Sequence, residues 1–79
     1  MQNEGNITKH NRIEELCKEN DVSMARLADY LGVSTSTLSA WASGRRPPFD
    51  SMIWKTIADA FDERVDYVMG LDRIDPEHY

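Results

Sequence analysis

The chain has 79 residues, of which 41% are hydrophobic and 29% are charged, a composition ordinary for one small globular domain. No apolar run approaches the ~20 residues that a membrane-spanning helix needs, and the polar first ten residues are unlike a signal peptide. The one cysteine, Cys17, has no partner for a disulfide or a metal cluster in this sequence. We therefore expect a cytoplasmic protein that is not associated with membranes and that carries no metal or cofactor.

The net charge of −5 is distributed unevenly along the chain. Residues 1–58 carry seven acidic and seven basic side chains, whereas residues 59–79 carry seven acidic side chains against two arginines. A neutral front half is compatible with nucleic-acid binding, but it lacks the basic footprint that such proteins commonly show.

The first predicted helix spans about residues 12–19. Residues 1–10 are polar and we expect a flexible arm. Asn11 followed three residues later by Glu14 is the pattern of a capping box, and Ile13, Leu16 and Cys17 then recur at helical spacing. We interpret Cys17 as a small core residue, since no base or second thiol accompanies it.

Serine and glycine residues mark the next two helices. Ser23 is the predicted N-cap of the second helix, and Gly32 ends it where the backbone needs a positive φ. Ser34 caps a third helix after only two intervening residues, and Gly44 stops that helix before a stiff Arg-Arg-Pro-Pro loop.

Two further helices complete an all-α domain over residues 11–70. The fourth opens at Asp50 or Ser51, and its apolar stripe is predicted at Ile53, Ile57, Ala60 and Phe61. A short fifth helix covers about residues 65–69 and ends before Gly70, and residues 71–79 are expected to be a loosely ordered acidic tail.

The second and third predicted helices have the spacing of a helix-turn-helix. Counted from Met24, a small Ala28 falls fifth, where two steeply crossing helices approach, and Gly32 falls ninth, at the tight turn. Apolar residues that would fill the wedge between the helices occupy the tenth, fifteenth and eighteenth positions: Val33, Leu38 and Trp41.

This segment resembles the Cro/cI-type (XRE-like) helix-turn-helix family of phage repressors and bacterial regulators. The likeness extends over about 60 residues, through the motifs Leu27–Ser34 (LADYLGVS), 36–41 (STLSAW), 57–61 (IADAF) and 66–70 (DYVMG). The resemblance implies a compact five-helix, lambda-repressor-like DNA-binding domain with the helix-turn-helix at helices 2 and 3.

By position, the resemblance also implies two sets of DNA contacts, because the third helix of this family lies in the major groove. Residues that would read base edges are Thr35, Ser36, Thr37, Ser39 and Ala40. Residues that would contact phosphates are Ser23, Met24, Ser43, Arg45 and Arg46.

Several positions depart from the family pattern. Met24 stands where the family commonly has a phosphate-binding Gln, and Thr35 and Ala40 are short where long polar side chains are frequent. The third helix, residues 35–43, carries no charge, so it offers hydroxyl and methyl groups but no bidentate contact to guanine. The face is therefore suited either to shape-dependent DNA reading or to a protein partner.

Two groups of apolar residues are candidates for contacts with another protein. Trp54 lies outside the predicted stripe of the fourth helix, which makes it a candidate for a contact at a protein–protein surface. The end of the domain has more apolar residues than one short helix needs, which favours a dimer contact through Val65, Tyr67, Val68, Met69 and Leu71.

The leading hypothesis is a small sequence-specific transcriptional regulator, Cro- or repressor-like and of phage or prophage type, that binds operator DNA as a homodimer. The alternative is an antirepressor that keeps the fold but binds and inactivates a partner repressor. A third reading is an antitoxin or a subunit of a larger complex. No triad or paired-carboxylate arrangement suggests an enzyme, and we assign no catalytic residues.

Overall fold

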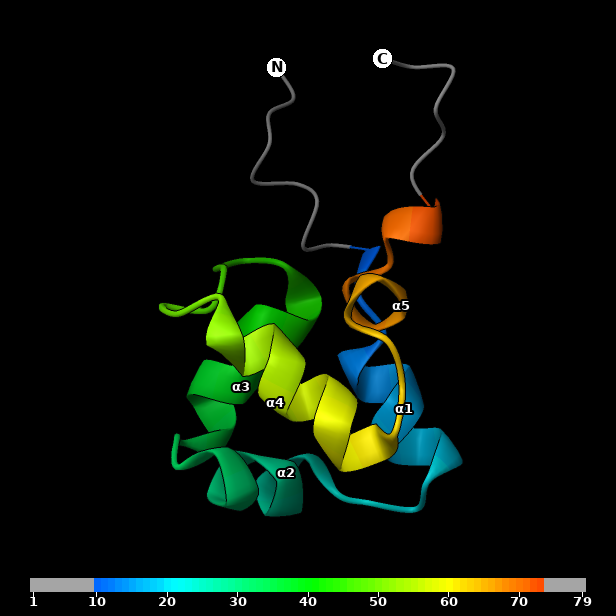
Figure 1. Cartoon of the computed structure of the whole chain (residues 1–79). Coiled ribbons are helices and arrows are strands. Elements are labelled where there is room, and N and C mark those ends of the chain that lie inside the picture. The colour runs from blue at the N-terminus through cyan, green and yellow to red at the C-terminus, as the bar shows by residue number, and fades with distance from the viewer. Residues whose placement is uncertain (1–9, 74–79) are drawn as a thin grey trace.

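The computed structural model describes residues 10–73, and every regular element among them is helical. The elements in chain order are α1 (Ile13–Glu19), α2 (Met24–Leu31), α3 (Thr35–Ser43), α4 (Met52–Phe61), α5 (Val65–Met69) and a 3₁₀ helix, η2 (Leu71–Arg73). Figure 1 shows α2 at one end of the domain, α3 beside α4, and α5 with the orange η2 toward the opposite end. The predicted all-α, five-helix architecture is confirmed.

Local capping chemistry sets the bounds of α2 and α3. The Ser23 hydroxyl accepts a hydrogen bond from the Arg26 N–H at 3.0 Å, and the Ser34 hydroxyl accepts one from the Thr37 N–H at 3.1 Å. Each serine satisfies a backbone donor that has no partner within its helix. Gly32 then ends α2 in the left-handed conformation, with φ of 77°, so the predicted turn of the helix-turn-helix is confirmed.

Asn11 joins the start of α1 to the end of α3. Its side-chain oxygen accepts a hydrogen bond from the Ile13 N–H at 3.1 Å, and its amide donates to the Trp41 carbonyl at 3.0 Å. In the capping box predicted with Glu14, the side chain of Asn11 would accept a hydrogen bond from the N–H of Glu14. In the structure this side chain accepts from the N–H of Ile13, and the N-cap residue of α1 is Arg12. Asn11 thus satisfies the start of α1 and at the same time fixes α1 against α3, a contact between residues 30 positions apart.

The wedge between α2 and α3 is filled as the spacing predicts. Leu38 and Trp41 are 0% and 1% exposed, and Ala28 lies fully buried at the crossing. Cys17 is also in the core, where burial raises the pKa of its thiol above the ordinary value. Its predicted role as a small core residue is confirmed.

The predicted buried face of α4 is confirmed at Ile57, which is 0% exposed, but it is wrong at Ala60, which is exposed, and it missed Trp54 and Ala58. Trp54 is only 5% exposed and belongs to the core together with Ile57 and Ala58, whereas Ile53 is half-buried. These three residues follow the i, i+3, i+4 pattern of one helix face. The large indole ring, a candidate for a surface contact, instead fills the space beside Ile57.

The segment after α5 is partly ordered against α1. Residues 71–73 form η2, and the Asp72 carboxylate receives two hydrogen bonds from the guanidinium of Arg12. The expectation of a loose tail is therefore wrong for these three residues. The predicted arm at residues 1–9 and the remainder of the tail, residues 74–79, lie outside the described residues.

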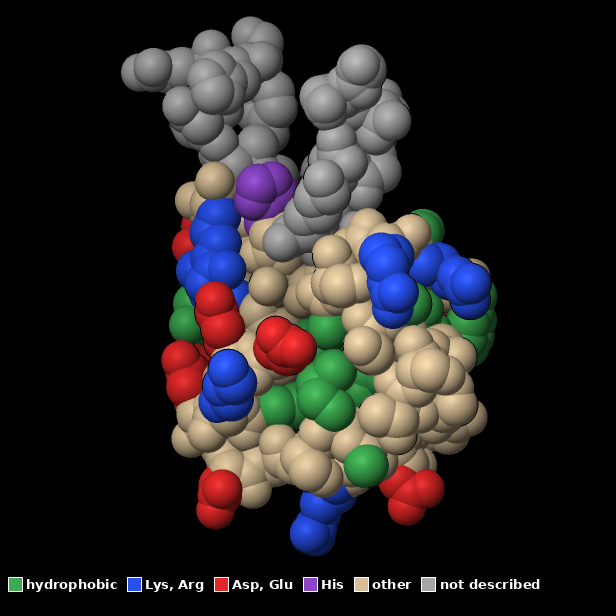
Figure 2. Space-filling model, turned by 180° about the vertical axis from the view of Figure 1, so that it is seen from behind, with side chains coloured by type: hydrophobic (Ala, Val, Ile, Leu, Met, Phe, Trp, Pro, Cys, Tyr) green, Lys and Arg blue, Asp and Glu red, His purple; other side chains and the backbone are tan. Residues whose placement is uncertain are grey.

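The surface seen from behind carries a central patch of hydrophobic side chains. Figure 2 shows this patch between the side on which α1 lies and the side on which α3 lies, with charged side chains around it. Basic side chains are visible on the side of α3 and the loop that follows it. Apolar surface of this kind is usual in a small domain, which has too little polar surface to cover its core.

Candidate nucleic-acid interface

The residues predicted to read DNA bases differ in how far α3 exposes them. Thr35, Ser36 and Ser39 are exposed and Thr37 is half-buried. Ala40 is only 8% exposed, so its methyl group lies at the bottom of a depression and not at the crest of the helix. None of the nine residues of α3 carries a charge.

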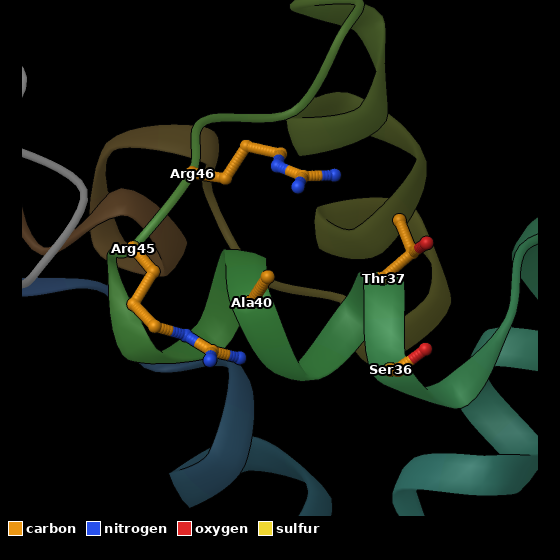
Figure 3. A pocket seen from close by; sticks show the side chains of 5 residues that line it. All are labelled: Ser36, Thr37, Ala40, Arg45 and Arg46. Atoms are coloured by element: carbon orange, nitrogen blue, oxygen red, sulfur yellow. The ribbon is translucent and has the colours of Figure 1, made fainter.

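The hydroxyl groups near the start of α3 are engaged with one another. The Ser34 hydroxyl donates to the Thr37 hydroxyl at 2.9 Å and lies 3.3 Å from the Ser36 hydroxyl. Figure 3 shows the oxygens of Ser36 and Thr37 turned toward the start of the helix, away from Ala40. Ser36 and Thr37 therefore direct their hydroxyl oxygens toward the N-cap of α3.

A hollow of about 280 Å³ lies along this face of α3, between the helix and the loop that follows it. Its lining residues are Ser36, Thr37, Ala40, Arg45 and Arg46. In Figure 3 the two guanidinium groups reach from the loop along α3, with Ala40 between them. Residues from two of the predicted sets, base-reading and phosphate-binding, are thus brought together at one site.

Ser43 positions one of these arginines. Its hydroxyl donates to the Ala40 carbonyl at 3.2 Å and accepts a hydrogen bond from Nε of Arg45 at 3.1 Å. Ser43 was predicted as a phosphate contact, and its hydroxyl is engaged within the protein. The sequence offered one signal for this role, namely a serine two residues before the arginine in a helix C-terminal turn.

The start of α2 contributes backbone rather than side chains to this surface. The Ser23 hydroxyl caps the helix, and the Met24 side chain is half-buried and packs against the core. Met24 therefore contributes to the packing of the domain, whereas a polar side chain at the same position could extend to a ligand. Amide groups at a helix N-terminus favour anions, so a phosphate contact through the backbone at this position stays a prediction.

The basic side chains of residues 10–73 differ in whether a carboxylate of the same range lies within ion-pair distance. Among residues 10–73, four basic side chains lie within 4 Å of a carboxylate: Arg12, Lys55, Arg64 and Arg73. In the same part of the chain, four have no carboxylate at that distance: Lys18, Arg26, Arg45 and Arg46. Lys18 is on α1 and Arg26 is on α2, whereas Arg45 and Arg46 follow α3 and line one hollow together, so this pair can attract an anion although the net charge is negative.

The predicted dimer contacts at the end of the domain are divided by burial. Val68 is 0% exposed and packs in the core, so its assignment to a surface contact is wrong. Tyr67 and Met69 are half-buried against the core, while Val65 and Leu71 are 37% and 39% exposed. Trp54 is likewise buried and presents no anchor for a partner.

Other kinds of site have little support in the part of the chain that the structure describes. No group of three or more His, Cys, Asp or Glu side chains within residues 10–73 is arranged to hold a metal ion. None of the helices there combines the length and the apolar character needed to cross a bilayer.

The match to known proteins falls on the same segment as this site. The family model of the helix-turn-helix matches residues 13–68, from the first residue of α1 to the penultimate residue of α5. The chain belongs to the helix-turn-helix family. The XRE-like resemblance of the sequence is thereby confirmed, and α3 is the second helix of the family's motif.

Two relatives from Bacillus subtilis (strain 168) share this domain. The protein described as the uncharacterized HTH-type transcriptional regulator YobD is 32% identical over 68 residues, which are 84% of this chain and 59% of that protein. The HTH-type transcriptional regulator AnsR is 35% identical over 63 residues, which are 78% of this chain and 53% of that protein. The chain thus spans little more than half the length of these relatives, and no solved structure matches it significantly.

Proposed function

We propose that this protein is a transcriptional regulator that binds double-stranded DNA sequence-specifically, with α3 in the major groove. The observation that carries the proposal is the position of Arg45 and Arg46, which lie beside α3 without a carboxylate partner among residues 10–73. Helix-turn-helix proteins place their second helix against base edges, and neighbouring groups bind phosphates. The names of the two relatives, both HTH-type transcriptional regulators, support the same function.

The charge distribution fits a docking geometry in which the two ends of α3 act differently. Short side chains at Thr35, Ser36 and Ser39 face the bases and allow close approach of the helix backbone. The arginines, which follow the C-terminal end of α3, then lie within reach of the phosphate backbone at the edge of the groove. Phosphate contacts would supply most of the affinity, and α3 would supply the discrimination.

The same proposal includes a homodimer and a Cro- or repressor-like role in a phage or prophage. Two copies of α3 about 34 Å apart would read the half-sites of a near-palindrome. Val65 and Leu71, the exposed apolar residues at the end of the domain, are the part of the predicted contact that remains available for dimerisation.

The test is the salt dependence of binding to duplex DNA. Each phosphate contact contributes about −0.9 to the slope of log K against log salt. Arg45→Ala and Arg46→Ala should each reduce the magnitude of that slope by about one unit and weaken binding to all sequences. Lys55→Ala is the matched control, because Lys55 on α4 pairs with Asp59 at 3.3 Å and should leave the slope unchanged. Equal slopes in all variants would contradict the proposal.

A second candidate function is that of an antirepressor that binds a repressor protein. The uncharged α3 and the inward packing of Met24 favour it, because both reduce the polar groups offered to DNA. It predicts a complex with a repressor encoded by a neighbouring gene, loss of that repressor's operator binding, and no salt-dependent binding of this protein to DNA. Salt-dependent DNA binding that requires the two arginines would exclude it.

A further inference from the structure

The lining of the hollow beside α3 is mostly polar, and its apolar part comes from Ala40 and the carbon atoms of Thr37, which lie between two cations. Ala40 forms the floor with its methyl group, and the Thr37 side chain presents its methyl because its hydroxyl is bonded to Ser34 at 2.9 Å. The guanidinium groups of Arg45 and Arg46 lie on either side of Ala40 (Figure 3). A ligand for this site needs a small apolar group at its centre and negative charge to either side.

On the proposed function, we infer that the hollow seats the 5-methyl group of a thymine in the major groove. Among the base edges in that groove, the thymine methyl is the apolar group, and phosphates flank the base along the strand. The inference rests on DNA binding, and it adds which base the site recognises and through which residues. The site recognises an A·T pair because the methyl group of the thymine packs against Ala40 and Thr37.

Guanine is the competing occupant of the hollow, and one hydrogen bond restricts one of the two arginines that could contact it. The commonest contact to guanine is a bidentate one from arginine. Nε of Arg45 already donates to the Ser43 hydroxyl at 3.1 Å, which directs this side chain along the helix. The hydroxyls of Ser36 and Thr37 are turned toward the cap, so the floor offers no side-chain donor or acceptor at its centre.

The experiment begins with binding sites selected by the protein from a pool of random DNA duplexes. Each thymine of the best duplex is then replaced, one at a time, by deoxyuridine, which lacks only the methyl group. We expect one thymine in each half-site at which the replacement weakens binding about four-fold, the effect of one buried methyl. At that position, 5-methylcytosine paired with guanine should bind more tightly than cytosine paired with guanine.

Variants of the protein test whether the thymine methyl group packs in the hollow beside α3. Thr37→Ser removes the methyl and retains the hydroxyl that bonds to Ser34, and Ala40→Gly removes the floor. Both should reduce the four-fold penalty of deoxyuridine toward none, with circular dichroism confirming that each variant is folded. Lys55→Ala, on α4 and outside the hollow, should keep the full penalty.

The outcomes separate this inference from the function on which it rests. Normal selection of a duplex with no sensitivity to deoxyuridine at any position overturns the inference and leaves DNA binding intact. A penalty that persists in both Thr37→Ser and Ala40→Gly overturns it equally, because the methyl then packs elsewhere. Failure to select or bind any duplex at low salt overturns the proposed function, and the inference fails with it.

Discussion

Arg12 and Asp72, 60 residues apart in the sequence, form a bidentate ion pair with N–O distances of 2.8 and 2.9 Å. The Arg12 guanidinium also donates to the Tyr67 carbonyl at 2.7 Å and lies 3.8 Å from the centre of the Tyr67 ring. One side chain at the start of α1 thus binds both α5 and η2. It fixes the end of the domain that carries the exposed Val65 and Leu71.

This ion pair predicts a pH dependence of stability. The hydrogen bonds from Arg12 lower the pKa of Asp72 below its ordinary value of 3.8. Because the folded pKa is the lower one, the contribution to stability is present above about pH 4 and is lost as the pH falls through the lowered pKa. Asp72→Asn should reduce the melting temperature at neutral pH, and the difference from the native protein should shrink as the pH is lowered toward 2.5.

Thermal melts at a series of pH values check this prediction. Asp29→Asn is a suitable control for the change in net charge, because Asp29 is exposed on α2 and has no ion pair among residues 10–73. A constant difference between Asp72→Asn and the native protein at all pH values would contradict it.

Gly70 and Gly32 should respond differently to the same substitution. Both have a positive φ, 76° and 77°, so Ala at either position incurs the left-handed strain of about 1–2 kcal/mol. A Cβ on Gly70 would also overlap the carbonyl oxygen of His10, whereas one on Gly32 would meet nothing within 4 Å. Gly70→Ala should therefore cost at least twice as much unfolding free energy as Gly32→Ala in urea titrations. Equal losses would show that the packing of residue 10 against α5 does not contribute to stability.

Trp54 should behave as a core residue and not as a contact for a partner. Trp54→Ala should lower the unfolding free energy by about 3–5 kcal/mol, because it removes a large side chain from a buried position. Phe49→Ala is the control, since Phe49 is 76% exposed and touches only the edge of the Trp41 ring system. Denaturant titration measures the unfolding free energies of the two variants, and only Trp54→Ala should show the large loss. If the Trp54→Ala protein is folded and stable and has lost only its self-association, the prediction is wrong and Trp54 acts as a contact between protein molecules.

The end of α4 offers a stabilising substitution. Asp62 adopts a left-handed conformation with φ of 56°, at the position where helices most often end in glycine. Asp62→Gly should relieve this strain and raise the unfolding free energy by up to about 1 kcal/mol, while DNA binding is unaffected. A decrease in stability in the same titration would mean that the Asp62 side chain contributes more than its backbone costs.

The sequence by itself determined the elements of this fold because their boundaries depend on local chemistry. Ser23 and Ser34 bond to backbone N–H groups three residues away, and Gly32 and Gly44 supply left-handed turns within their own segments. The spacing of small and apolar residues between them was likewise enough to predict the crossing of α2 and α3. These interactions span a few residues, so a pattern in the chain reports them directly.

The tertiary structure alone decided which face of each helix is used. The buried stripe of α4 shifted from Ile53 to Trp54 because several faces of that helix are apolar, and the neighbouring helices select one of them. The Arg12–Asp72 pair joins segments too distant for any local pattern to connect. On α3, the hydroxyls of Ser36 and Thr37 lie within hydrogen-bond distance of the Ser34 hydroxyl, and a hollow lined by residues of α3 and of the following loop lies beside them. Contacts of this kind exist only after the helices have packed, because packing brings distant groups within bonding distance and determines which remain exposed.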